Sequence, residues 1–386
     1  MNPKADTIKA CFIAPKAFPL FNHGVKALFG GAEMDLHILA TELAKDNKFA
    51  VSFVTADYGQ RPVEEINHVR IIKSLDFKKN IFDGAIKVWR ALRKAEAQIY
   101  FQEAASWGTF LVALFCKLNK RAFVYRTASL RECNGTYMKE NLLAGKAFRW
   151  SLRNAACVIV QNQAGSDAIL ETLGIRTEVI SGAHHLPPLS HQKRDTILWV
   201  ARSAKVKRPE LFIKLAQEMP EEHFTMVCRR ATGDQDYEKL LEQAKAVRNL
   251  VFIERAEFDE IDRYFSRAKV FVCTSRAEGF PNTYIEACKH GTPILSLCVN
   301  PDDFITKYRC GLCAGDDWRR FVSGLKQMLN PGQAEEYGKN ARRYAEQNHD
   351  ITVIIEKYKT LFDQFGRIQF GKRGSLRRCS GPSTAP

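Results

Sequence analysis

Two glutamates stand on either side of a short loop in the segment SRAEGFPNTYIEACKHG, residues 275–291. Seven residues separate Glu278 from Glu286, and a glycine, a proline and an amide lie in the first half of that gap. Carboxylates accept hydrogen bonds from hydroxyl groups, so a pair spaced in this way can hold a ribose on one side and a sugar on the other. The alternative is that Thr283 and Glu286 form only a capping box, Thr-x-x-Glu, and that Glu278 is solvated.

The elements around this segment are predicted to be a strand, a loop and a helix. The apolar run VFVC, residues 270–273, is typical of a buried strand, which places Glu278 just past its carboxyl end. The segment TYIEACKHG begins with a good N-cap, Thr283, and stops at Gly291, which suits the left-handed position after a helix. The first N–H groups of such a helix lie at the positive end of its dipole and bind phosphate. The predicted cradle for a phosphate or diphosphate consists of Gly279, Phe280, Pro281, Asn282 and Thr283.

Two cations follow another predicted strand, in TILWVARSAKVKRPE, residues 196–210. Arg202 lies at the end of this strand, and Lys207 comes five residues later. Two fixed positive groups there can neutralise a diphosphate without a metal ion, although a pair of surface cations would give the same pattern. A glycine pair, Gly30 and Gly31, precedes an earlier predicted helix and permits close backbone approach to an anion. The chain has neither a G-x-G-x-x-G fingerprint nor a P-loop, which removes the usual support for nicotinamide or ATP binding.

The composition is that of a globular protein. With 386 residues, 45% of them hydrophobic, the chain is long enough for two domains that each have a core. The longest apolar run, near WGTFLVALFC, is too short to cross a bilayer, and the first residues resemble no signal peptide. Eleven cysteines, an odd number scattered through predicted strands and helices, favour reduced thiols in the cytoplasm.

The net charge of +15 suits phosphorylated ligands, acidic lipids or nucleic acid. Part of the charge lies in the last residues, GKRGSLRRCSGPSTAP, which have too little apolar content to fold. Another part lies on one face of a predicted helix, which could rest on an anionic membrane surface but could equally be a solvated face. The cations of that face are Lys139, Lys146, Arg149 and Arg153. Neither a DNA-reading patch nor an aromatic stacking motif is present, so nucleic acid is not an expected partner.

These motifs resemble the retaining glycosyltransferases of glycosyltransferase family 4, which have the GT-B fold. The resemblance rests on the glycine pair, the strand with Arg-x4-Lys, and the segments NLVFIERAEFDEIDRYFSRAKVFVCTS and EGFPNTYIEACKHGTPILS. It extends from about Lys9 to Phe365 and is strongest between Asn249 and Leu297. The resemblance implies an α/β GT-B protein, with two Rossmann-like doubly wound domains facing across a cleft and the diphosphate of a nucleotide sugar between them.

The resemblance also implies a role for each motif. Arg202 and Lys207 would stabilise the leaving diphosphate. Glu278 would contact the donor sugar, Glu286 would hold the ribose, and Gly31 would let the first domain's backbone close on the phosphates. Neither a metal ion nor a cofactor is expected, because the cations and the helix dipole carry the charge of the leaving group. Many relatives have a histidine after the strand that corresponds to AFVYRTAS; this chain has none there, and the residues that fill the space are Arg126, Thr127 or Ser129.

Alternating strands and helices, interrupted by AHHLPPLSHQKRD, indicate two α/β domains joined by a linker. We expect a first, acceptor-side domain at 1–185 and a linker at 186–195. A second domain, at 196–350, is expected to bind the nucleotide sugar. A terminal helix at 351–367 would return to the first domain, and a disordered basic tail would occupy 368–386.

The function implied is transfer of a hexose, with retention, from a nucleotide-diphosphate sugar to a glycan or lipid-linked acceptor in cell-surface polysaccharide or glycolipid synthesis. We expect a cytoplasmic protein that rests on the inner face of the cell membrane. Two alternatives stay open. One is a GT-B nucleotide-sugar epimerase, which would act on the donor without an acceptor. The other, more remote, is a non-catalytic basic protein that binds nucleic acid.

Overall fold

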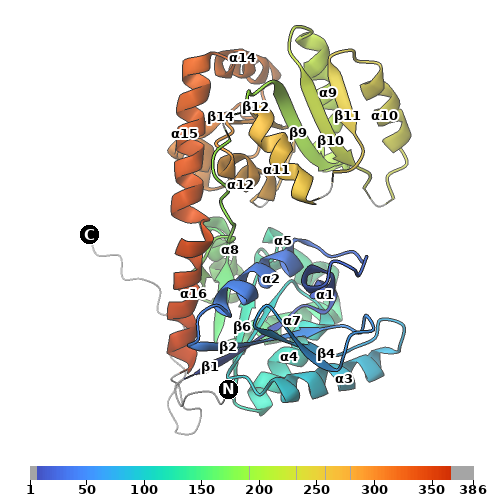
Figure 1. Cartoon of the computed structure of the whole chain (residues 1–386), viewed down its shortest axis with the longest axis vertical. Coiled ribbons are helices and arrows are strands. Elements are labelled where there is room, and N and C mark those ends of the chain that lie inside the picture. The colour runs from blue at the N-terminus through green and yellow to red at the C-terminus, as the bar shows by residue number, and fades with distance from the viewer. Residues whose placement is uncertain (1–6, 191, 232, 257, 279, 367–386) are drawn as a thin grey trace, which may run out of the picture. The chain divides into compact units, whose positions relative to one another are not determined.

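The chain divides into two α/β units, one formed by residues 1–184 with 351–386 and the other by residues 185–350 (Figure 1). The structure is a computed structural model that describes residues 7–190, 192–231, 233–256, 258–278 and 280–366. The predicted basic tail and Gly279 of the predicted phosphate cradle therefore lie outside the described residues. None of the helices in the described ranges combines the length and the apolar character needed to span a bilayer.

The first unit is built on an eight-stranded sheet in the order β3-β4-β2-β1-β5-β6-β7-β8. All neighbouring strands run parallel except β3 and β4, which form an antiparallel pair at the edge. The parallel strands are nearly continuous apolar runs because helices cover both faces of the sheet. The strands are β1 (Ile8–Ile13), β2 (Phe49–Thr55), β3 (Val63–Ile66), β4 (Val69–Lys73), β5 (Ile99–Glu103), β6 (Ala122–Arg126), β7 (Cys157–Val160) and β8 (Glu178–Val179).

Two hydrophobic cores lie on the two faces of this sheet. The first lies between the strands, α2 and the C-terminal helix α16, whose Phe362 ring contacts Phe12 of β1 at 6.3 Å between ring centroids. The second lies under α3, α4, α7 and α8. The helices of this unit are α1 (Phe18–Phe21), α2 (Gly31–Leu43), α3 (Ile81–Ala95), α4 (Trp107–Leu118), α5 (Leu130–Cys133), α6 (Thr136–Glu140), α7 (Leu142–Arg153), α8 (Gln163–Leu173) and α16 (Ile351–Gly366), with a 3-10 turn at Pro15–Ala17.

The second unit has a six-stranded sheet, and all of its strand pairs are parallel, in the order β11-β10-β9-β12-β13-β14. One hydrophobic core lies on each face of the sheet. The strands are β9 (Thr196–Arg202), β10 (Phe224–Arg229), β11 (Leu250–Ile253), β12 (Ala268–Cys273), β13 (Ile294–Ser296) and β14 (Gly311–Cys313). The helices are α9 (Pro209–Glu218), α10 (Tyr237–Lys245), α11 (Phe258–Arg267), α12 (Asn282–Lys289), α13 (Phe304–Lys307), α14 (Trp318–Met328) and α15 (Pro331–Asn348), with 3-10 turns at Lys205–Lys207 and Pro301–Asp303.

The predicted α/β class with two doubly wound sheets is confirmed. The single basic helix face predicted over 139–153 is wrong. The chain breaks at Asn141, which has non-helical backbone angles, so Lys139 ends in α6 while Lys146, Arg149 and Arg153 belong to α7. The edge strand β3, with the sequence VEEI, was not expected, because two adjacent glutamates do not follow the alternation of a half-buried strand.

Candidate functional site

The predicted cations and the first predicted acid meet at one point of the second sheet. The chain runs from β9 outward to β10 and β11 on one side, and then returns to β12, β13 and β14 on the other. Loops that leave two neighbouring strands in opposite directions open a crevice at the carboxyl edge of an α/β sheet, and ligands bind there. Arg202 is the last residue of β9, and Glu278 follows β12. The fold therefore places both residues at this switch point.

Hydrogen bonds fix the loop after β9 against the end of β12. The hydroxyl of Thr274, which accepts from Trp199 Nε1 at 3.0 Å, donates to the carbonyl oxygen of Lys207 at 2.7 Å. The backbone N–H of Arg276 donates to the carbonyl oxygen of Val206 at 2.8 Å. Lys207 thus sits on a short 3-10 turn that is held directly beside the strand preceding Glu278.

Arg208 is a site residue that the sequence did not single out. Its Nε donates to the carbonyl oxygen of Thr274 at 2.7 Å, and its Nη1 forms an ion pair with Asp316 at 2.6 Å. A cation between Lys207 and Pro209 was visible in the sequence, but both of its partners lie far away along the chain. Arg208 therefore works as a tie that joins the loop after β9 to two other segments of the site.

Lys207 and Glu278 are in direct contact. The Nζ atom of Lys207 lies 2.5 Å from Oε2 of Glu278, and the two side chains are 21% and 16% exposed. In a nucleotide-diphosphate sugar, the sugar is bonded directly to the terminal phosphate. A cation that binds this phosphate and an acid that binds the sugar must therefore be neighbours, as these two side chains are.

The helix after Glu278 begins earlier than the sequence predicted. The N-cap of α12 is Pro281, whose carbonyl oxygen accepts from the backbone N–H of Tyr284 at 2.9 Å. The prediction of Thr283 as N-cap is wrong, because this bond already places Thr283 inside the first turn. The alternative capping box between Thr283 and Glu286 is therefore excluded as well. Within the described residues no side chain caps α12, so the backbone N–H groups of Asn282 and Thr283 remain the donors at the positive end of its dipole.

The side chains of this first turn are anchored in the core. The Phe280 ring lies 5.1 Å from that of Phe304 and 5.8 Å from that of His349, between centroids. The hydroxyl of the buried Tyr284 donates to the carbonyl oxygen of Val299 at 2.8 Å. Phe280 therefore contributes to the predicted cradle only through its backbone, while its side chain fixes the position of the turn.

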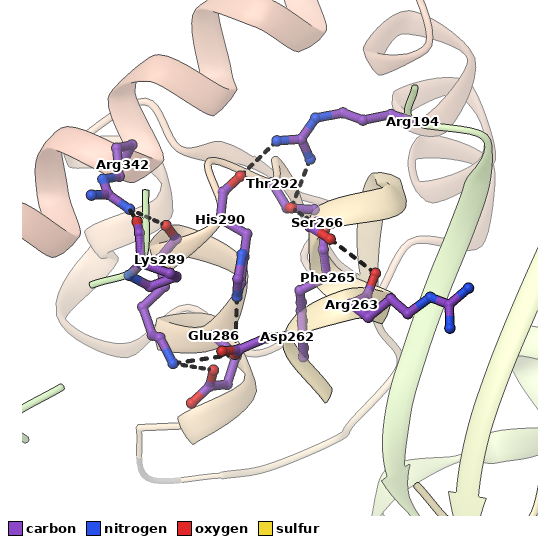
Figure 2. A network of polar contacts seen from close by, with 11 residues as sticks. Arg194, Asp262, Arg263, Phe265, Ser266, Glu286, Lys289, His290, Thr292 and Arg342 are labelled. Atoms are coloured by element: carbon purple, nitrogen blue, oxygen red, sulfur yellow. Dashed lines mark hydrogen bonds and ion pairs between the residues drawn. The ribbon is translucent and has the colours of Figure 1, made fainter. Parts of the chain in front are cut away.

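Glu286, the second predicted acid, is part of a polar network that Figure 2 shows. Its Oε2 forms an ion pair with Nζ of Lys289 at 2.8 Å, and the same Nζ lies 3.5 Å from Oδ1 of Asp262 (Figure 2). His290 Nε2 is 3.0 Å from the same Asp262 oxygen, and this hydrogen bond, together with the charge of Lys289, lowers the pKa of Asp262. Asp262, Glu286 and His290 lie close enough to hold a metal ion, but the Lys289 ammonium already lies between the two carboxylates as their cation.

Two arginines hold the end of α12. Arg194 Nη1 donates to Thr292 Oγ1 at 2.8 Å, and its Nη2 donates to the His290 carbonyl oxygen at 2.6 Å (Figure 2). Arg342 Nη1 donates to the carbonyl oxygen of Lys289 at 2.5 Å. Gly291 ends the helix with φ of +60°, in the left-handed conformation that the sequence predicted.

In the first unit, the predicted glycine pair begins α2. Gly30 is the N-cap and Gly31 is the first helical residue; both are exposed. The N–H of Gly30 donates to the carboxylate of Glu33 at 2.8 Å, an acceptor that any bound phosphate would have to replace. The sheet order of this unit reverses at β1, so the loop that carries the pair also lies at a switch point.

Of the three residues proposed to fill the space of the missing histidine, Ser129 alone is exposed. Arg126 is fully buried, and its Nη1 forms ion pairs with Asp35 at 2.9 Å and Glu103 at 3.0 Å. Burial raises the pKa of both carboxyl groups, although the arginine opposes this effect. Arg126 is therefore a structural centre at the carboxyl ends of β5 and β6, whose side chain cannot reach an acceptor without rearrangement.

Comparisons with known proteins place the second unit in a family. Residues 184–344 match the family model of glycosyl transferases group 1. Spore coat protein SA of Bacillus subtilis is 25% identical over 183 residues, which are 44% of this chain and 48% of that protein. The chain spans about half the length of the curated relatives it matches.

Solved structures resemble the whole chain. Sucrose-phosphate synthase from Thermosynechococcus elongatus has a TM-score of 0.72 at 18% identity, with 92% of this chain and 98% of that chain covered. Anabaena HepE, in complex with UDP, has a TM-score of 0.69 at 15% identity, with 92% and 100% covered. At such identities the likeness establishes the fold. The chain therefore has the GT-B fold of these glycosyltransferases, and its second unit is a glycosyl transferase group 1 domain.

Proposed function

We propose that this protein is a retaining glycosyltransferase that moves a hexosyl group from a nucleotide-diphosphate sugar to a glycan or lipid-linked acceptor. The observation that carries the proposal is the contact between Lys207 and Glu278 at the switch point of the second sheet. A family match over this unit supports it, as do the structures of Anabaena HepE, which contain UDP and UDP-glucose.

The second unit supplies the groups for the donor. The diphosphate binds to the N–H groups of Asn282 and Thr283, with Lys207 and Arg202 as counter-charges. Glu278 accepts hydrogen bonds from the sugar hydroxyls, and Glu286 accepts them from the ribose. Neither ligand requires a metal ion, because the two cations and the helix dipole balance the diphosphate charge.

In the proposed reaction, the acceptor hydroxyl oxygen forms a bond to the anomeric carbon while the bond from that carbon to the phosphate oxygen breaks. The departing phosphate oxygen takes the proton of the acceptor hydroxyl. Negative charge on the diphosphate grows as the bond breaks, so Lys207 and the positive end of α12 bind the transition state more tightly than the ground state. The acceptor then carries the sugar with the configuration that it had in the donor.

The position of the charged groups suits a role in cell-surface polysaccharide or glycolipid synthesis, in which acceptors are glycans or lipid-linked sugars. The first unit is proposed to bind this acceptor at the carboxyl edge of its sheet, near the loop that carries Gly30 and Gly31. Ser129, which is exposed after β6, is a candidate contact.

Thermal unfolding with UDP, GDP and ADP tests the donor site. A nucleotide at about 100 times its dissociation constant adds about 2.7 kcal/mol to the free energy of unfolding, which gives a clear shift in Tm. We expect one nucleotide to produce this shift, with and without a chelator, and Glu286→Ala to weaken it. If none of the three nucleotides shifts Tm, the second unit binds no such donor and the proposal fails.

A further inference from the structure

Seven large apolar side chains of the first unit are exposed at the N-terminal ends of three helices. Ile81 and Phe82, at the start of α3, are 85% and 84% exposed, and Leu142 and Leu143, at the start of α7, are each 74% exposed. Trp107 begins α4 and is 58% exposed. We call these residues, together with Phe77 and Ile86, the apolar rim. Soluble proteins rarely gather so many protruding apolar side chains unless the side chains bind something.

The fold places the apolar rim along one edge. The helices α3, α4 and α7 each lead from one parallel strand to the next, so each begins at the carboxyl edge of the sheet. Their inner sides share one hydrophobic core, with α4 packed between α3 and α7. Figure 1 shows α3 and α4 side by side under the sheet. The starts of the three helices therefore form a continuous row, with the amino edge of the sheet at the opposite end.

Cations accompany the apolar rim. Lys78 and Lys79 are exposed in the loop directly before Ile81, and Arg90 is exposed two turns into α3. On α7, Lys146 and Arg149 are exposed within two turns of the leucines. Apolar side chains at a tip, with lysines and arginines beside them, match the boundary between the acyl chains and the headgroups of an anionic bilayer.

We propose that the apolar rim docks this protein on an anionic lipid surface by inserting its side chains among the headgroups. Protrusion favours a bilayer over a folded partner, because a bilayer accepts isolated apolar tips without a complementary pocket. The inference adds a partner to the proposed function and does not depend on it. If both hold, the docked edge is the edge at which the first unit is proposed to bind a lipid-linked acceptor.

Vesicle binding of the full chain tests the proposal. The probes are vesicles of phosphatidylcholine alone and of phosphatidylcholine mixed with phosphatidylglycerol, in cosedimentation at low salt. We expect binding to the mixed vesicles, at least about tenfold weaker for the I81S/F82S variant and weakened by K78E/K79E. The matched control is Leu118→Ser, because Leu118 is 65% exposed at the opposite end of α4 and lies outside the apolar rim.

Fluorescence gives a second readout. Trp107 emission should shift to shorter wavelength on the mixed vesicles, and the Trp107→Phe variant identifies its share of the signal. Binding that is equal for the unmodified chain and I81S/F82S would overturn the proposal. So would a dimer, seen by analytical ultracentrifugation, that forms through the same residues in place of vesicle binding. Calorimetry with UDP on the same variants separates the two proposals, since the donor groups lie in the second unit.

Discussion

The contact between Lys207 and Glu278 leads to opposite expectations for the two residues. Lys207→Ala removes a cation that is proposed to bind the diphosphate, and a hydrogen bond to a charged group contributes about 1.5–3 kcal/mol. We expect UDP to bind roughly 10- to 150-fold more weakly to this variant. Glu278→Gln has the opposite effect, because it removes the carboxylate that competes with UDP for the same ammonium.

The size of the second effect follows from the exposure of the pair. Both side chains are partly exposed, at 21% and 16%, so the ion pair is worth at most about 1 kcal/mol. UDP should therefore bind up to about fivefold more tightly to Glu278→Gln. The same variant should transfer sugar more slowly, because it loses the acceptor for the sugar hydroxyls. An affinity that rises while turnover falls is a pattern that general damage to the fold does not produce.

Isothermal titration calorimetry with UDP measures both affinities, and hydrolysis or transfer of UDP-glucose measures turnover. The matched control is Lys205→Ala, an exposed cation on the same 3-10 turn with no proposed ligand. The reasoning is refuted if Glu278→Gln weakens UDP binding as Lys207→Ala does, or if Lys207→Ala and Lys205→Ala bind UDP equally well.

Two further predictions concern the stability of the units. Arg126→Met leaves Glu103 buried without its cation, which should cost about 3–5 kcal/mol in urea unfolding at neutral pH. The cost should shrink as the pH falls: the raised pKa of Glu103 means that the folded state holds its proton up to a higher pH than the unfolded state, so stability is lost as pH rises; a cost below about 1 kcal/mol would contradict this. Gly338→Ala brings a methyl group to 2.5 Å from the carbonyl oxygen of Gly291 and should destabilise by about 1–3 kcal/mol, whereas Gly332→Ala on the same helix meets nothing within 4 Å and should be neutral or stabilising. Equal Tm values for these two variants would show that α15 moves away at no cost.

The sequence predicted the layers of the fold because buried parallel strands are short apolar runs that local composition reveals. It did not predict the start of α12, since a proline that accepts the first helical hydrogen bond competes with a threonine that is an equally good cap by type. The break at Asn141 was missed for a similar reason. Nothing in the spacing of Lys139, Lys146 and Arg149 marks a change of helix axis.

The candidate site was predictable to the extent that its residues end strands. Arg202 and Glu278 were assigned to the carboxyl ends of two strands from local sequence, but their proximity depends on the strand order, which local sequence does not contain. Lys289 lies one helical turn from Glu286 and could have been found as its partner. Asp262, which shares the Lys289 ammonium, comes from another helix and could not.

The hydrogen bonds behind Lys207 bear on how this site would act on its substrate. The turn that carries Lys207 is bonded to Thr274 and Arg276, and Arg208 ties the same turn to Asp316. Its backbone is therefore in place before a donor arrives, and binding spends little free energy on ordering it. A cation that is fixed in advance stabilises charge that develops on a leaving group better than one that must first be ordered. We therefore expect Lys207→Ala to reduce the rate of transfer by a larger factor than it reduces UDP affinity, because the diphosphate carries more negative charge in the transition state than in the bound donor.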